Sequence, residues 1–197
     1  MNIIGISAYY HDSAAALIQD GKIISAAQEE RFTRKKNDNS FPKNSIKFIL
    51  KNSKIDLNNI DYVCFYEKPL LKFERLIETY LSFSPRGFKQ FAMSMPLWIK
   101  GKLFEKDMLF QELKKIDKNF NKEKIYFSKH HMSHAASAFY PSPFEKAVIL
   151  TVDGVGEWNT STVSLGDRES IDFKKEINFP HSLGLLYSAF TYYIGFK

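Results

Sequence analysis

The sequence lacks the features that would place the chain in a secreted or membrane class. Its single cysteine, Cys64, cannot form a disulfide within the chain. No apolar run approaches the roughly 18 residues that a membrane-spanning helix needs. Residues 1–6 show no basic segment followed by a long apolar core, so they do not resemble a signal peptide. These absences predict a cytoplasmic protein without a membrane partner.

A basic arm is also absent, although the chain is basic as a whole. Lys and Arg number 28 and Asp and Glu number 22, which gives a formal net charge of +6. The cations are distributed over predicted helices and loops, and no aromatic stacking motif accompanies them. This distribution favours a solvated surface first, small anionic ligands second and nucleic acid last. Hydrophobic residues at 44% and charged residues at 25% are typical of a globular protein.

The first two thirds of the chain alternate between strand and helix patterns. Three apolar runs (2–7, 14–19 and 22–28) predict an antiparallel meander, because Asp20-Gly21 is a strong two-residue hairpin signal. Apolar spacing and flanking prolines then predict further elements. They are helices at 44–51, 70–83, 107–118 and 131–139, strands at 61–66 and 124–128, and an irregular stretch at 85–96.

The same order then starts again. Residues 146–152, 161–165 and 173–178 predict three strands, and residues 182–194 predict a strongly apolar helix. A repeated strand-strand-strand-helix order predicts an α/β protein of two lobes with a cleft between them. We assign residues 1–144 to the first lobe and residues 145–197 to the start of a second lobe, which we expect to be truncated.

Two histidines four residues apart are the sharpest chemical signal. On a helix, His130 and His134 would lie one turn apart on one face, as two neighbouring metal ligands do. A third ligand would be needed, and Asp153 could supply it only if the fold brings it close. The alternative interpretation is a polar helix N-terminus. His131 lies off that face and is expected to be structural.

Two turns follow apolar strands and carry polar groups. In the turn after residue 152, Asp153 could hold Mg²⁺, and Gly154 and Gly156 would let backbone amides approach a phosphate. In the turn after residue 7, His11 is a candidate general base and Asp12 is its acidic neighbour. Either turn could also be an ordinary polar connection between strands.

A basic run follows the third predicted strand. Arg31, Arg34 and Lys35 could hold an anionic substrate, since arginine binds anions in a bidentate manner. Such a run is more often a solvated surface.

Taken together, these segments resemble the NodU/CmcH-type carbamoyltransferase family. Four motifs in the family's order carry the resemblance: residues 5–17 (GISAYYHDSAAAL), 28–35 (QEERFTRK), 130–139 (HHMSHAASAF) with 142–144 (SPF), and 153–157 (DGVGE). The family's amino-terminal domain is similar to the ATPase that modifies tRNA adenosine with threonylcarbamoyl. The resemblance therefore implies the actin-like ATPase fold of the sugar kinase and actin superfamily.

The resemblance also implies an activity and its cofactors. Carbamoyl phosphate and ATP would give carbamoyl-adenylate, and the carbamoyl group would pass to a hydroxyl of a sugar or natural product. His130 and His134 would bind an iron-type metal, with Mg²⁺ as a further ion accompanying ATP. Asp153, Gly154 and Gly156 would lie at the phosphates, and His11 would take the proton of the acceptor hydroxyl. Asp12, Arg31, Arg34 and Lys35 are the candidate substrate-binding residues.

The chain departs from the family in length. The family's third metal ligand, an aspartate, lies later in the second lobe, and a YrdC-like domain follows. We therefore expect a complementary carboxy-terminal chain to complete the active site, and we expect the chain by itself to self-associate through residues 182–197. The alternative is a non-catalytic remnant that binds a nucleotide or a partner. A sugar-kinase-like phosphotransferase is disfavoured, because kinases of that fold need no histidine metal site.

Overall fold

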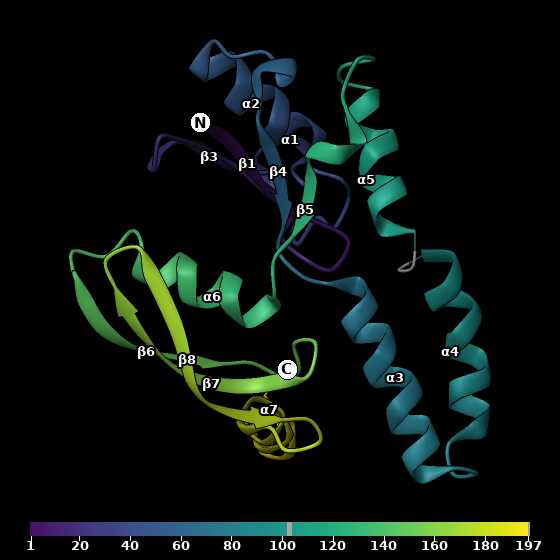
Figure 1. Cartoon of the computed structure of the whole chain (residues 1–197). Helices are drawn as coiled ribbons and strands as arrows, with labels where there is room; N and C mark the ends of the chain where they lie inside the picture. Colours follow the sequence, from purple (N-terminus) through teal and green to yellow (C-terminus); the bar gives the residue numbers. More distant parts are fainter. Residues whose placement is uncertain (102–103, 197) are drawn as a thin grey trace. The chain divides into compact units, whose positions relative to one another are not determined.

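The computed structural model describes residues 1–101 and 104–196 and contains two compact units (Figure 1). The first unit comprises Met1–Tyr66 and Leu97–Phe127, and the second comprises Glu67–Pro96 and Ser128–Lys197. The predicted boundary at residue 144 differs from this division. Residues 128–144 group with the second sheet because helix α6 (His130–Phe139) packs Ala135 and Phe139 against Ile149 of that sheet.

The first unit is built on a mixed five-stranded sheet in the order β3-β2-β1-β4-β5. The meander of β1 (Asn2–Ser7), β2 (Ala14–Gln19) and β3 (Lys22–Gln28) is antiparallel, and the predicted bounds of all three strands are confirmed. Strands β4 (Tyr62–Phe65) and β5 (Ile125–Phe127) continue the sheet in parallel to β1. Asp20 and Gly21 both have positive φ, at 48° and 80°, as the predicted hairpin turn requires.

Helices α2 (Lys43–Ser53) and α5 (Glu105–Lys114) pack on this sheet, and α1 (Glu30–Thr33) is a single short turn after β3. Short 3₁₀ turns at Leu57–Asn59 and Lys122–Lys124 precede β4 and β5. The core of the unit consists of alternate strand residues and one face of each long helix. Its most deeply buried members include Ile4, Leu17, Ile46, Ile49, Val63, Phe65, Leu109 and Leu113.

The second unit contains an antiparallel sheet in the order β6-β7-β8, formed by β6 (Lys146–Val152), β7 (Asn159–Asp167) and β8 (Ser170–Asn178). Helix α6 covers one face of this sheet, and α7 (Leu183–Tyr193) lies on the other face (Figure 1). A second meander followed by a helix thus confirms the repeated element order. Helix α3 (Pro69–Phe83) also belongs to this unit.

The prediction of an irregular stretch at residues 85–96 is wrong. Helix α4 (Phe88–Gly101) occupies most of it and includes Pro96 in its interior. Proline removes one backbone donor and bends a helix, but it does not prevent helical structure before it. Phe91 of α4 stacks on Tyr80 of α3, with ring centroids 3.9 Å apart. This contact stabilises the part of α4 that precedes Pro96.

Among the described residues, none of the helices combines the length and apolar character required to span a bilayer. The observation agrees with the sequence, in which no apolar run is long enough.

Candidate functional site

The first turn of α6 is anchored by a buried carboxylate. The backbone N–H of His130 donates to both carboxylate oxygens of Glu157, at 2.9 and 3.0 Å, and the N–H of Lys68 donates to Oε1 at 2.8 Å. A negative charge is favourable at a helix N-terminus, where backbone donors lack partners within the helix. Glu157 therefore fixes the start of α6, and with it the backbone that carries His130.

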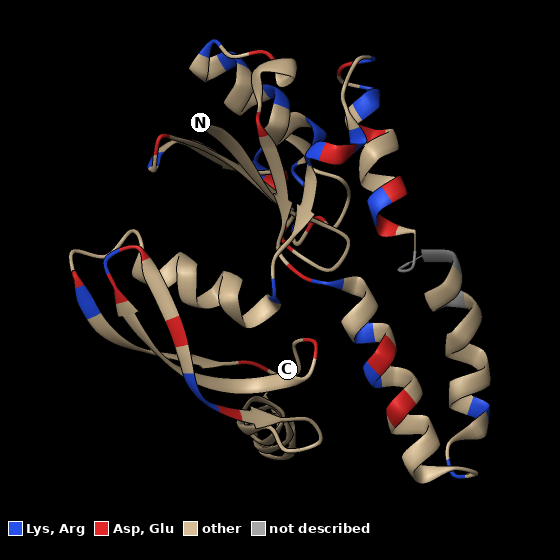
Figure 2. Ribbon diagram, viewed as in Figure 1, with Lys and Arg blue, Asp and Glu red and all other residues tan. Residues whose placement is uncertain are grey.

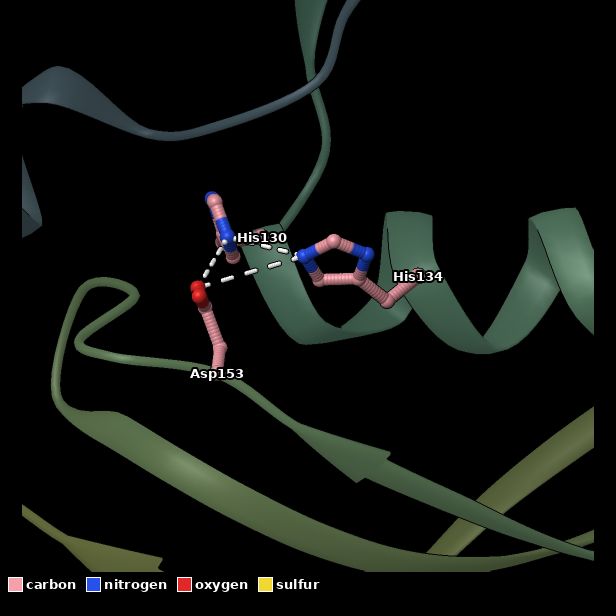
Figure 3. Close-up of side chains that lie close together, drawn as sticks. All are labelled: His130, His134 and Asp153. Atoms are coloured by element: carbon pink, nitrogen blue, oxygen red, sulfur yellow. Dashed lines mark hydrogen bonds and ion pairs between the residues drawn. The ribbon is translucent and has the colours of Figure 1, made fainter. Parts of the chain in front are cut away.

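Three side chains from α6 and the end of β6 converge in the second unit (Figure 3). His130 Nε2 lies 2.8 Å from Asp153 Oδ2 and 3.0 Å from His134 Nε2. His134 Nε2 lies 3.9 Å from the same aspartate oxygen. The predicted histidine pair does form on one helix face, and the fold brings Asp153 to it. A third donor is thus present within the chain, whereas the resemblance placed the family's third metal ligand in a later part of the second lobe, outside this chain.

The turn after β6 holds Asp153 in place. Its backbone N–H donates to the carbonyl of Thr160 at 2.8 Å, and its Oδ1 accepts the N–H of Gly154 at 2.6 Å. The hydroxyl of Ser182, the N-cap of α7, donates to the carbonyl of Gly154 at 2.6 Å. The carboxylate is therefore set by contacts with both β7 and α7.

The cluster shifts the pKa of each of its members. Burial alone would lower the pKa of His130, but the hydrogen bonds to Asp153 and Glu67 outweigh it and raise that pKa to about 9. The hydrogen bond from His130 lowers the pKa of Asp153. Burial, together with the charge of His130, lowers the pKa of His134. At neutral pH these shifts give a protonated His130, an ionised Asp153 and a neutral His134.

The donor set and its spacing fit a divalent transition metal. Donors bound at about 2.1 Å and at right angles lie about 3 Å apart, and donors of one ion can be separated by up to about 4.2 Å. The three distances between donor atoms are 2.8, 3.0 and 3.9 Å. Two imidazoles and one carboxylate suit Fe(II) and Zn(II). His130, His134 and Asp153 are therefore the residues that would hold such an ion.

His131 has the structural role expected for it. Its ring is buried, and Nε2 donates to the carbonyl of Asn159 at 2.8 Å. Nδ1 accepts from the hydroxyl of Thr151 at 2.6 Å, and that hydroxyl is also bonded to Thr162. Burial lowers the pKa of His131, in keeping with a neutral ring that joins α6 to β6 and β7.

Gly156 leaves room for two histidine rings, a role that the sequence did not predict. A Cβ on Gly156 would lie 2.9 Å from the ring of His131 and 3.2 Å from that of His130. The N–H of Gly156 donates to the carbonyl of Asn159 at 3.0 Å, and the N–H of Gly154 donates to Asp153. Both amides therefore already have acceptors and would have to exchange them to bind a phosphate. Phosphate binding by these amides stays a prediction.

The candidate base His11 lies in the β1–β2 turn of the first unit. Its side chain is 62% exposed, and its Nδ1 lies 3.0 Å from Asp12 Oδ2. The turn is anchored at both ends, because the N–H groups of Tyr9 and Ser13 donate to the carbonyls of Asn39 and Asp38. Asp12 thus orients the imidazole through Nδ1, which leaves Nε2 as the ring nitrogen that is not bonded to Asp12.

The basic run after β3 divides into structural and exposed parts. Arg31, Arg34 and Lys35 are exposed, and the guanidinium of Arg31 lies 3.8 Å from Glu30. Glu29 of the same motif is buried and accepts the backbone N–H groups of Asn44 and Ser45 at the start of α2. The motif therefore carries a helix anchor beside its cations, and a substrate contact by the cations stays a prediction.

Sequence reasoning assigned no role to three residues around the histidine cluster. Glu157 anchors α6, and Arg75 of α3 donates to the carbonyls of Gly156 and Glu157 at 2.7 and 2.6 Å. Glu67, just before α3, approaches Nδ1 of His130. Glu157 is the last residue of the motif at residues 153–157, and membership of that motif is the signal by which it could have been found. Glu67 and Arg75 have no comparable local signal.

Gly184 in the first turn of α7 lies against the backbone of Asp153, and we expect Gly184→Ala to disturb the cluster. A Cβ there would overlap the carbonyl group of Asp153 and lie 2.8 Å from the backbone nitrogen of Gly154. Because backbone atoms cannot yield as flexible side chains do, α7 or the turn must move. Overpacking of this kind costs about 1–3 kcal/mol. Thermal denaturation and titration with Co²⁺ should show lower stability and weaker metal binding.

Gly5→Ala is the matched control for this substitution. A Cβ on Gly5 of β1 would meet no atom within 4 Å, so the same change should leave metal binding unaffected. Unchanged stability and metal affinity in Gly184→Ala would show that α7 does not brace the aspartate.

Comparisons with known proteins agree on one family. The family model described as Carbamoyltransferase N-terminus matches residues 2–197. An uncharacterised protein of Synechocystis sp. is 54% identical over 198 residues, covering 100% of this chain and 32% of that protein. Nodulation protein NolNO of Sinorhizobium fredii is 35% identical, over 95% of this chain and 26% of that protein. The chain spans about a third or less of these relatives, and it belongs to the carbamoyltransferase family, matching its amino-terminal part.

Proposed function

We propose that the chain supplies the amino-terminal part of an O-carbamoyltransferase with the actin-like ATPase fold. The observation that carries the proposal is the cluster of His130, His134 and Asp153, whose donor atoms all lie within 4.8 Å of one another. The repeated order of three antiparallel strands and a helix supports the two-lobed fold. Membership of the carbamoyltransferase family supports the reaction class.

The proposed reaction begins with the hydrolysis of carbamoyl phosphate to carbamate and phosphate. A carbamate oxygen then bonds to the α-phosphorus of ATP, and pyrophosphate leaves to give carbamoyl-adenylate, from which the carbamoyl group is transferred. In the transfer, the acceptor oxygen bonds to the carbamoyl carbon while the bond from that carbon to the AMP phosphate oxygen breaks. AMP leaves with the electron pair, and the acceptor proton goes to His11. A metal held by His130, His134 and Asp153 would supply positive charge beside the nucleotide phosphate. Mg²⁺ accompanying ATP is a further proposed ion.

The contribution of His11 follows from its hydrogen bond. Asp12 Oδ2, 3.0 Å from Nδ1, favours the tautomer with the proton on Nδ1. Nε2 then carries the lone pair that can accept the hydroxyl proton of a sugar or natural product. Arg31, Arg34 and Lys35 are exposed cations with which the first unit could attract carbamoyl phosphate and the nucleotide.

The test combines the chain with the part of the Synechocystis relative that extends beyond the matched region. We expect transfer from ¹⁴C-carbamoyl phosphate to a panel of sugars only when ATP and both polypeptides are present. His11→Ala should lower transfer by about a hundredfold or more, the usual contribution of a general base. His181→Ala, an exposed histidine outside the cluster, is the matched control.

Two results would count against this function. Equal transfer by the wild type and His11→Ala would remove His11 from the mechanism. Nucleotide binding without turnover, in the presence of both polypeptides and every acceptor, would instead favour a module that only binds a nucleotide or a partner.

A further inference from the structure

Glu67 lies behind the histidine cluster as a buried carboxylate. It precedes α3 in the second unit, and its exposed fraction is 1%. Its Oε2 lies 3.3 Å from Nδ1 of His130 and also accepts a short ion-pair hydrogen bond from Lys72. A buried carboxylate is costly unless it is paired, and His130 and Lys72 are both partners that are cationic or can become so. The ion pair with Lys72 links Glu67 to α3, but it does not account for the contact of Glu67 with His130.

The chemistry of imidazole gives that explanation. A histidine that binds a metal through Nε2 must keep its proton on Nδ1, and an acceptor beside Nδ1 fixes both the tautomer and the ring orientation. In His130 the two nitrogens face different partners. Nε2 faces Asp153 and His134 at 2.8 and 3.0 Å, and Nδ1 faces Glu67.

We propose that Glu67 is the positioning residue of the metal site. By accepting the Nδ1–H of His130, it aims Nε2 at the point shared with His134 and Asp153, and its negative charge makes the imidazole a stronger ligand. This inference rests on the proposed metal site and extends it from the ligands to the group behind them.

Lys72 has a separate part in the arrangement. Its side chain is 15% exposed, and its ammonium group pairs with the same oxygen of Glu67 that faces His130. The pair compensates the negative charge of the buried carboxylate. Removing Lys72 breaks the ion pair but leaves the acceptor for Nδ1–H, whereas removing the charge of Glu67 affects both. The two residues can therefore be distinguished by substitution.

The experiment measures metal affinity by titrating the full chain with Co²⁺ and following its visible absorption. Glu67→Gln is expected to weaken Co²⁺ binding about 10- to 100-fold, as is usual when the carboxylate behind a metal-bound histidine is lost. Lys72→Gln should stay within about threefold of the wild type. Glu74→Gln is the matched control, because Glu74 is an exposed glutamate of α3.

A second measurement does not depend on the folding of any variant. In ¹⁵N-labelled wild type loaded with Zn²⁺, histidine ring spectra should show His130 bound through Nε2, with a slowly exchanging proton on Nδ1. Circular dichroism establishes which variants are folded. If Glu67→Gln does not fold, the ring spectrum of the wild type decides, and a His130 without a protected Nδ1–H overturns the proposal.

The outcomes separate this inference from the function on which it rests. Co²⁺ bound by the wild type and equally well by folded Glu67→Gln overturns the role of Glu67 and leaves the metal site standing. A wild type that binds no Co²⁺ overturns the metal site itself. A loss in Lys72→Gln as large as that in Glu67→Gln would assign the effect to the ion pair, and would likewise overturn the role proposed for Glu67.

Discussion

Replacing His130 and His134 together by alanine is expected to abolish measurable binding of a divalent transition metal. The double substitution removes two of the three donors that lie within 4.8 Å of one another. The loss of one residue behind a ligand typically costs 10- to 100-fold in affinity, so the loss of two ligands should exceed about a hundredfold. Equilibrium dialysis with Zn²⁺ or anaerobic Fe²⁺, followed by metal analysis, measures the effect.

The controls for this prediction come from the same chain. His181→Ala removes an exposed imidazole outside the cluster and should bind metal as the wild type does. His134→Ala alone removes the more exposed ligand, with 52% exposure against 12% for His130, and so least disturbs the packing. Equal metal content in the wild type and the double variant would show that the cluster is only a hydrogen-bonded network.

The repeated sheet-and-helix order could be predicted from the sequence because it depends on local patterns of apolar and turn residues. Apolar alternation and the Asp20-Gly21 turn fixed the bounds of β1, β2 and β3, and both turn residues have the positive φ that the pattern requires. Helix α4 was missed because Pro96 is a strong local breaker, whereas the stacking of Phe91 on Tyr80 is a tertiary contact. Local propensity is weaker than such packing.

The candidate site likewise combines a local feature, which the sequence predicts, with contacts between residues far apart in the chain, which it does not. The spacing of His130 and His134 is local, and their convergence followed from helix geometry alone. Asp153 is 23 residues from His130, and Glu67 is 63 residues from it. Contacts at such separations depend on how α6 docks on β6 and β7, which no periodicity in the sequence specifies. Sequence reasoning could therefore name the histidines and could offer Asp153 only on the condition that the fold brings it close, and it gave no indication of Glu67.

The face of the second sheet that carries α7 exposes a large apolar surface. Helix α7 has no charged residue and none of its side chains is buried, and in Figure 2 it is uncharged along its whole length. The adjacent strands add exposed apolar side chains on the outer side of the sheet, namely Val148, Leu150, Val152 and Leu165. An exposed apolar surface of this kind usually becomes an interface. We therefore expect the chain to self-associate through this α7 face.

Tyr187→Lys with Phe190→Lys should weaken that association. The two side chains are 75% and 60% exposed and lie one turn apart, so the substitutions place charges on the surface without opening the fold. Burying each side chain is worth about 1.5–3 kcal/mol. If half of this burial free energy is lost at each of the two positions, the association constant falls roughly tenfold to a hundredfold. Sedimentation velocity over a range of concentrations should show oligomers for the wild type and mainly single chains for the variant.

The control must separate lost apolar surface from added charge. Gln111→Lys with Asn119→Lys adds the same two positive charges at exposed polar positions and removes no apolar side chain. If charge repulsion alone dispersed the oligomers, this pair would act as strongly as the α7 pair, because both raise the formal net charge from +6 by two. Contact through α7 instead predicts that Gln111→Lys with Asn119→Lys associates like the wild type. A wild type that sediments as a single chain at every concentration would show that the α7 face makes no contact between copies.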